Sequence, residues 1–319
     1  MNINDVDFLF KLKGVFKILL LFNLYKFFYF FLLIFLCFQT SIVQANEGNK
    51  KIKNFSKSKT FLKKIHQERP VTFYCQCNYN NNRPNWESCG FRPRKDEKRA
   101  SRIEWEHILP ASYFGKKFNA WVNGHPICIS RKGKKFKGRK CTERVHKLYR
   151  YMQADLYNLQ PAIGEVNGMR SNYQIGEIDG EEREFGKCDI EIKNQKVEPA
   201  PKIRGNIART YLYMEQTYPQ YIKFNQSIKK LIIKWDQEDP VDEWECKRAI
   251  LISNIQGNTN KILQERCTNK IKIGNIKLIN KKIGQNDKID EGKANALYKK
   301  SGRNKKGVFT GKGTSNSFK

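Results

Sequence analysis

Eight cysteines follow an apolar N-terminal segment, and this combination constrains the fold more than any other feature of the sequence. Basic residues precede the apolar stretch 18–38, and Val43-Gln44-Ala45 follows it. A basic start, an apolar run and a small-residue cleavage site are typical of a secretory signal peptide. The stretch is also long enough for a membrane anchor, but Asn23 and Lys26 interrupt it. We therefore predict a cleaved signal peptide, residues 1–45, and no stable membrane span in the mature protein.

Export changes what the cysteines mean. The eight that remain after cleavage are Cys75, Cys77, Cys89, Cys128, Cys141, Cys188, Cys246 and Cys267. An even number in an exported chain predicts disulfides. A zinc site is the alternative, but zinc ligands usually come as two C-x₂₋₄-C pairs, and the sequence has no such second pair. Four disulfides are favoured, and their connectivity is left open.

The charge of the chain points to a polyanionic partner. It has 61 Lys and Arg against 31 Asp and Glu, a formal net charge of +30. Such an excess indicates nucleic acid, anionic lipid or an acidic polymer, unless it reflects only a Lys-rich composition. Seven of the ten residues 131–140 are basic, with Gly and Phe136 between them. A mobile cationic loop of this kind suits phosphates.

Composition divides the chain into four parts. Residues 1–45 are the signal peptide, 46–65 a basic N-terminal arm, 66–267 a single compact domain, and 268–319 a basic tail with 14 Lys and Arg. Low hydrophobicity and high charge predict that the tail is disordered. The compact domain is predicted to be α+β, because helices and strands do not alternate as βαβ units do.

Local patterns predict the elements of this domain. We expect strands at 71–77 and 101–109, strands and turns over 176–202, and helices at 58–70, 142–158, 205–219, 225–240 and 241–258, with a short helix starting at Pro161.

The stretch "RIEWEHILPASYFG", residues 102–115, carries the strongest chemical signal. A neutral imidazole such as His107 can deprotonate water, and the neighbouring Glu106 carboxylate suits a hard cation such as Mg²⁺. Glu104 is interpreted as an exposed or salt-bridged acid. Adjacent strand residues point to opposite faces. Glu106 and His107 can therefore share a site only if the strand twists, bulges or ends near them.

Two further segments offer polar groups. Residues 155–172 include Asn158, Asn167 and Asn172, which are either caps and turn formers or ligands, and the residue types alone do not decide. Arg139 lies two residues before Cys141, so a disulfide is able to fix it. A fixed arginine is what stabilisation of a phosphate needs.

At these residues the sequence resembles a known family. The stretches "RIEWEHILPASYFG", "GRKC", "DLYNLQPAIGEVNGMRSNY", "GNIARTYLYM" and "PVDEWEC" together are similar to the bacterial endonuclease I family of exported, non-specific nucleases. The resemblance spans about 66–267. It implies a disulfide-stabilised domain with a ββα-metal (His-Me finger) motif and products with 5′-phosphates.

The resemblance also implies roles for individual residues. His107 matches the general base, Glu106 and Asn167 match the ligands of one Mg²⁺ (Mn²⁺ or Ca²⁺ as substitutes), and Arg139 matches the arginine that steadies the phosphate. Gln153 departs from the pattern, since some relatives have Glu there.

We therefore expect a monomeric, periplasmic or secreted endonuclease that binds double- and single-stranded nucleic acid through backbone phosphates. The preference between DNA and RNA stays open. A non-catalytic basic nucleic-acid-binding protein and a cationic membrane-active protein are the alternatives.

Overall fold

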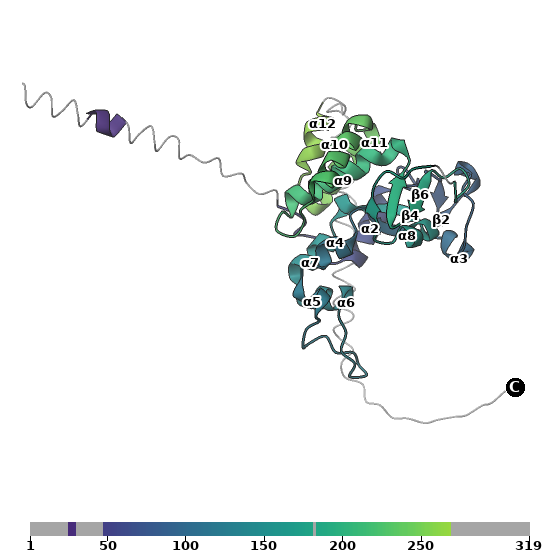
Figure 1. Ribbon diagram of the computed structural model, residues 1–319, viewed down its shortest axis with the longest axis horizontal. Coiled ribbons are helices and arrows are strands. Elements are labelled where there is room, and N and C mark those ends of the chain that lie inside the picture. Colours follow the sequence, from purple (N-terminus) through teal and green to yellow (C-terminus); the bar gives the residue numbers. More distant parts are fainter. Residues whose placement is uncertain (1–24, 30–46, 181–182, 269–319) are drawn as a thin grey trace, which may run out of the picture. The chain divides into compact units, whose positions relative to one another are not determined.

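The computed structural model of the protein describes residues 25–29, 47–180 and 183–268 (Figure 1). Residues 25–29 are helical and belong to a unit separate from the rest of the chain. Among the described residues, no helix has the length and apolar character needed to cross a membrane. Apart from residues 25–29 and Thr268, the predicted signal peptide and C-terminal tail lie outside the described residues.

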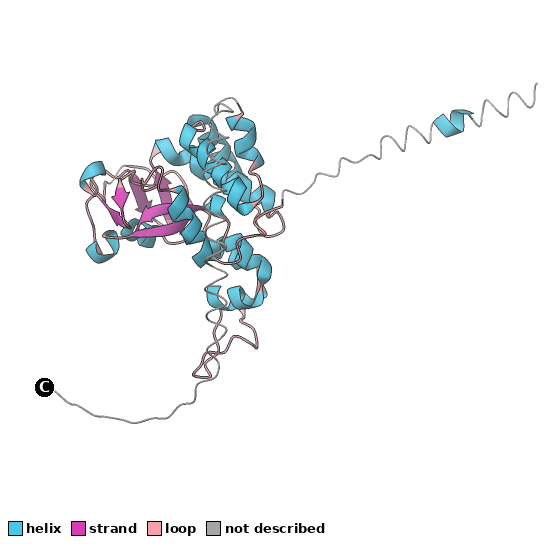
Figure 2. Cartoon of the chain, turned by 180° about the vertical axis from the view of Figure 1, so that it is seen from behind, coloured by secondary structure: helices cyan, strands magenta, loops and turns pink. Residues whose placement is uncertain are grey.

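The body of the protein, residues 47–268, mixes helices with small sheets, which confirms the predicted α+β class. Its helices are α2 (Phe55–Ile65), α3 (Glu97–Ala100), α4 (Ala111–Gly115), α5 (Asn119–Val122), α6 (Arg139–Val145), α7 (Lys147–Gln153), α8 (Gly164–Arg170), α9 (Arg204–Thr217), α10 (Gln226–Glu238), α11 (Glu243–Gln256) and α12 (Lys261–Cys267), with 3₁₀ turns at Glu87–Cys89, Leu156–Asn158 and Pro201–Ile203. Figure 2 shows the strands gathered on one side of the body and the long C-terminal helices on the other.

The strands form three small sheets. They are β1 (Tyr79–Asn80) with β2 (Arg83–Pro84), β3 (Ile103–His107) with β4 (Leu159–Ile163), and β5 (Gln174–Ile175), β7 (Lys196–Pro199) and β6 (Ile190–Lys193) in that spatial order. Strands β3 and β4 are antiparallel and pair without a break from Ile103 opposite Ile163 to His107 opposite Leu159.

Four disulfides tie the body together, as predicted. They are Cys75–Cys188, Cys77–Cys89, Cys128–Cys141 and Cys246–Cys267. Cys75–Cys188 joins residues 113 positions apart, and closing a loop of that size stabilises a fold by about 4–5 kcal/mol in the chain-entropy account. The other three close short loops and fix local structure.

Three local predictions are wrong. Residues 72–77 form a tight turn instead of a strand, since Thr72 N–H donates to the Cys77 carbonyl and Gln76 has a φ of 57°. The predicted helix 142–158 breaks at His146, whose φ of −107° and ψ of 111° are extended. Pro161 lies inside β4, where a proline is tolerated because the sheet has only two strands.

The segment expected to be a basic arm, 46–65, packs on the body instead. Ile52 is 1% exposed, and the buried Asn49 donates its side-chain amide to the Tyr151 carbonyl at 2.9 Å. Helix α2 begins after Asn54, whose side chain accepts from Lys57 N–H as an N-cap. The compact body therefore begins some residues before residue 66.

Asp155 fixes the chain directly after α7. It is fully buried, and its carboxylate accepts hydrogen bonds from Tyr213 (2.8 Å), Tyr218 (2.7 Å) and Gln256 (2.8 Å). Burial raises the pKa of Asp155, and these donors oppose the rise. The network holds the end of α7 against the C-terminal helices, and the site described below depends on that end.

His66 in the core gives a pH-dependent prediction. The side chain is buried, and its Nε2 accepts from Arg248 Nε at 3.3 Å. Burial, and then the charge of Arg248, lower its pKa well below the ordinary 6.5. Below pH 6.5 His66 is therefore protonated in the unfolded chain but stays neutral in the folded chain. As a result, the free energy of unfolding falls as the pH falls.

We expect His66→Gln to remove this dependence. Relative to the variant, the native protein should lose up to about 1.4 kcal/mol of unfolding free energy per pH unit below pH 6.5. Urea unfolding at several pH values measures the difference, and His125→Gln, at an exposed histidine, is the control. Parallel stability curves for the native protein and His66→Gln would contradict the prediction.

Candidate active site

A single cavity of about 890 Å³ contains all four residues that the sequence nominates. They come from three parts of the chain: Glu106 and His107 from β3, Arg139 from the start of α6, and Asn167 from α8. Helix α2 supplies another part of the lining. The structure thus brings together segments that are up to about a hundred residues apart in the sequence.

The end of β3 explains how two adjacent residues reach one cavity. All five residues of β3, 103–107, line it. In the described part of the chain β3 pairs with β4 alone, and residues from both faces of the strand contribute to the cavity lining. The strand also ends at His107, which is one of the three arrangements that the sequence allowed.

His107 is held as a neutral imidazole. Its Nε2 lies 2.8 Å from the backbone carbonyl of Gln153. A carbonyl only accepts, so Nε2 carries the proton and Nδ1 is the nitrogen left to accept one. Burial, followed by the charge of Arg139, lowers the pKa of His107 to about 3. The ring also packs against Phe55, with centroids 4.7 Å apart.

Glu106 forms a buried ion pair. Its Oε1 accepts from Arg170 Nη1 at 3.1 Å and from the Tyr74 hydroxyl at 3.4 Å. Burial raises the pKa of Glu106 to about 7, while the charge of Arg170 opposes the rise. The same guanidinium donates to the carbonyls of His107 (3.4 Å) and Ile108 (2.6 Å). Arg170 therefore fixes the Glu106 side chain and the backbone beside His107 together.

Asn167 is oriented by Glu104. The Asn167 Nδ2 donates to Glu104 Oε2 at 2.8 Å, which leaves the amide oxygen for another partner. Glu104 is itself held by Arg99 and Arg102 at 2.7 and 2.8 Å. Burial raises the pKa of Glu104, but these arginines outweigh burial and hold it below the usual value. The salt-bridged reading of Glu104 is thus confirmed, and Glu104 also orients a site residue.

Gln153 connects His107 to Arg139. Its backbone carbonyl accepts from His107, and its side-chain Oε1 accepts from Arg139 Nε at 3.0 Å. Arg139 also lies over the ring of Phe55, with 5.1 Å from Cζ to the centroid. Within the described parts of the chain, the buried Nη2 of Arg139 has no hydrogen-bond partner. Arg139 as a residue also lines the cavity.

The sequence did not reveal three contributors to the site. Phe55 lies in the stretch interpreted as an arm. Arg170 lies in the segment 155–172, where only the asparagines stand out as candidate ligands. The backbone carbonyl of Gln153 is a group that every residue has. A usable signal existed for Phe55 alone, because Asn54 is a good N-cap residue and starts a helix there.

The donor set fits a hard divalent cation. Glu106 offers a carboxylate and Asn167 an amide oxygen on one cavity, and oxygen ligands are those that Mg²⁺ and Ca²⁺ prefer. Tyr74 and Arg170 hold Glu106 through Oε1, and the carboxylate lines the cavity. Two protein ligands would leave the remaining coordination positions to water and phosphate oxygens.

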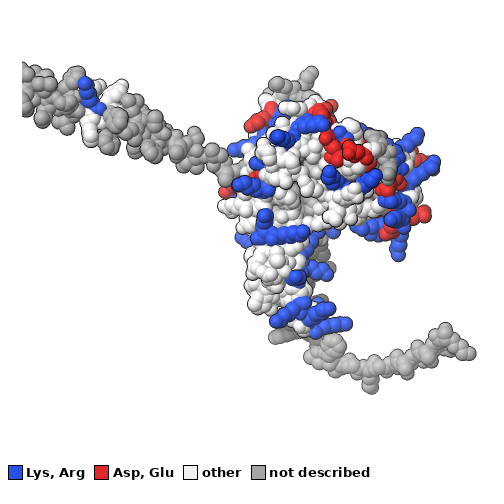
Figure 3. Space-filling view, in the orientation of Figure 1, with Lys and Arg blue, Asp and Glu red and all other residues white. Residues whose placement is uncertain are grey.

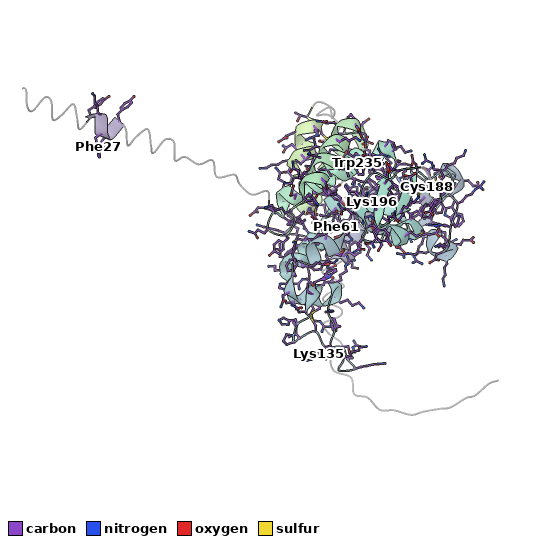
Figure 4. The ribbon with its side chains drawn as sticks, viewed as in Figure 1. Phe27, Phe61, Lys135, Cys188, Lys196 and Trp235 are labelled. Carbon is purple, nitrogen blue, oxygen red and sulfur yellow. A yellow bond between two sulfur atoms is a disulfide. The ribbon has the colours of Figure 1, made fainter. Side chains whose placement is uncertain are left out.

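A basic lobe, residues 116–140, extends from the cavity. It contains nine Lys and Arg and no acid. Figure 3 shows Lys and Arg side chains along the lower lobe, and Figure 4 shows Lys135 near its tip. The disulfide Cys128–Cys141 closes the lobe beside Arg139. Trp121 and Arg139 belong to the lobe and also line the cavity, so the lobe adjoins the candidate site.

Comparison with known proteins gives one consistent answer. A family model described as endonuclease I matches residues 38–267. The chain is 41% identical to an extracellular deoxyribonuclease of Aeromonas hydrophila over 71% of this chain and 94% of the relative. It is also 41% identical to endonuclease-1 of Buchnera aphidicola subsp. Acyrthosiphon pisum, over 69% of this chain and 84% of the relative. A periplasmic deoxyribonuclease of Aeromonas hydrophila is again 41% identical, over 70% of this chain and 90% of the relative. The chain therefore belongs to the endonuclease I family.

Proposed function

We propose that this protein is an exported, metal-dependent endonuclease that hydrolyses phosphodiester bonds of DNA and RNA without sequence specificity. The observation that carries the proposal is the convergence of Glu106, His107, Arg139 and Asn167 on one cavity. Family membership supports a nuclease, and the relatives named extracellular and periplasmic deoxyribonucleases support a periplasmic or secreted location. We further propose that β3, β4 and α8 form the ββα-metal motif.

His107 acts as the general base in this proposal. Its Nδ1 accepts the proton of a water that attacks the phosphorus, while the Gln153 carbonyl keeps the proton on Nε2. Burial, and after it the charge of Arg139, hold the pKa of His107 at about 3. A phosphate bound to Arg139 neutralises that charge and raises the pKa of His107 toward the range of an effective base.

The other residues hold the phosphate. Arg139, oriented by Gln153, donates to a non-bridging oxygen. Glu106 and Asn167 would hold the cation, which would supply positive charge to stabilise the charge that develops during cleavage. The leaving 3′-oxygen takes its proton from water. Cleavage at that oxygen leaves a 5′-phosphate on the product.

The absence of sequence specificity follows from the kind of contact. Arg139 and the basic lobe reach backbone phosphates, which carry no sequence information. DNA and RNA share those phosphates, so we include RNA among the substrates.

Metal removal tests the proposal directly. We expect the purified, oxidised protein to convert supercoiled plasmid to nicked and then short DNA with Mg²⁺, and to degrade RNA as well. EDTA should abolish both reactions, and excess Mg²⁺ should restore them. Binding of plasmid without cleavage under Mg²⁺, Mn²⁺ or Ca²⁺ would instead support a non-catalytic nucleic-acid-binding protein.

A further inference from the structure

Helix α2 forms a wall of the candidate active site, although it lies outside the segment that the sequence assigned to the catalytic domain. Five of its residues line the cavity: Phe55, Ser56, Lys59, Thr60 and Lys63. Their spacing of one, three and four residues places them on one face of a helix. The opposite face contains the buried residues Ser58, Leu62 and Ile65. The helix therefore has one face for packing and one for the cavity.

Several contacts fix this wall relative to the base. The Ser58 hydroxyl donates to the Ala154 carbonyl at 2.7 Å, one residue after Gln153. Phe55 packs between His107 and Arg139, at 4.7 and 5.1 Å. Helix α2, His107 and Arg139 thus all contact residues 153 and 154 at the end of α7. These contacts set the distance between α2 and the two site residues.

The cavity face of α2 carries positive charge and no acid. Within the parts of the chain that the structure describes, neither Lys59 nor Lys63 forms an ion pair, and the helix contains no Asp or Glu. Lys59 Nζ lies 5.1 Å from the Phe55 ring centroid, while Lys63 is exposed. Lys59 and Lys63 are four residues apart, which corresponds to a rise of roughly 6 Å along the helix. This rise is comparable with the distance between successive phosphates on one strand of nucleic acid.

We propose that Lys59 and Lys63 bind backbone phosphates that flank the scissile one, so that α2 is a second phosphate-binding element besides Arg139 and the basic lobe. The Ser56 and Thr60 hydroxyls, which lie on the same face, add neutral donors. This inference rests on the proposed nuclease function, because it assumes that nucleic acid enters the cavity.

Helix α2 also supplies its own control. Lys57 and Lys64 are exposed lysines on the same helix that do not line the cavity. The double variants Lys59→Gln/Lys63→Gln and Lys57→Gln/Lys64→Gln remove the same charge from the same element. Any general effect of net charge on nucleic-acid affinity is therefore equal in both. Lys59→Arg/Lys63→Arg keeps the charge on the cavity face and should bind almost normally.

Binding is measured by fluorescence anisotropy with a labelled DNA duplex in EDTA, over a range of NaCl concentrations, with His107→Ala as the common background. We expect the cavity-face pair to weaken binding about tenfold and to lower the slope of log Kd against log salt by roughly 1.8, since each phosphate contact contributes about 0.9. The control pair should change the slope far less. Equal changes in the two pairs, or an unchanged slope in the cavity-face pair, would overturn the proposal.

The cleavage assay separates this proposal from the nuclease function. With His107 restored and Mg²⁺ present, the cavity-face variant should show a raised KM and nearly unchanged kcat. Failure of the native protein to cleave would refute the nuclease function and leave the binding result standing. Normal cleavage together with equal binding by the two double variants would refute only the role of α2.

Discussion

Replacing His107 with alanine is expected to lower kcat by about 10²–10⁴-fold while leaving the affinity for nucleic acid nearly unchanged. The imidazole is the buried nitrogen base of the cavity, with Nε2 committed to the Gln153 carbonyl and Nδ1 left to accept a proton. Its removal takes away the proposed proton transfer, whereas Arg139 and the basic lobe, which we propose hold the phosphates, are untouched.

The measurement is plasmid cleavage under saturating Mg²⁺, with anisotropy for binding. His125→Ala is the matched control, because His125 is an exposed histidine in the basic lobe and should keep full turnover. Added imidazole should restore part of the activity of His107→Ala by entering the space left in the cavity. Equal turnover by the native protein and His107→Ala would remove His107 from the mechanism.

Replacing Arg170 with methionine is expected to destabilise the protein by about 3–5 kcal/mol, since it leaves the buried Glu106 carboxylate without its charge partner. Arg170 is 1% exposed and lies 3.1 Å from Glu106 Oε1. It also donates to the carbonyls of His107 and Ile108, so activity should fall with stability. Urea unfolding measures the free energy, and plasmid cleavage measures the activity.

A double variant separates charge from packing. We expect Arg170→Met/Glu106→Gln to recover part of the lost stability, because no unpaired charge is then buried. Arg150→Met is the control. Arg150 also donates to a backbone carbonyl, that of Glu143 at 3.0 Å, but it forms no buried ion pair with an acid in the described part of the chain. If Arg150→Met and Arg170→Met lower the free energy of unfolding by the same amount, loss of the ion pair with Glu106 is not the cause of the destabilisation.

Much of the site region follows from local pattern. The apolar alternation of Ile103 and Trp105 predicts a strand over 101–109, and β3 lies within that range. The even cysteine count after a leader predicts the four disulfides. Patterns of this kind are readable because each residue's preference agrees with its neighbours.

The rest depended on contacts between distant segments. Helix α2 has a lysine-rich sequence, and a serine occupies one of its three buried positions, so its buried face is hard to recognise. Arg170 carries a charge that normally indicates a surface residue, and only the fold reveals that Glu106 lies beside it. The break at His146 divides a segment with good helical pattern, and it places Gln153 where its carbonyl meets His107.

The anchoring of the N-terminal segment has a consequence for the order in which the body can be completed. Asn49 N–H donates to the Tyr218 hydroxyl at 3.0 Å, although the two residues are 169 positions apart, and Tyr218 in turn donates to Asp155. The segment that leads into α2 is synthesised early, but this contact cannot form until Tyr218 in the C-terminal part of the body is present. A chain that ends before Tyr218 therefore lacks this anchor, even though the contacts of α2 with Ala154, His107 and Arg139 are already possible.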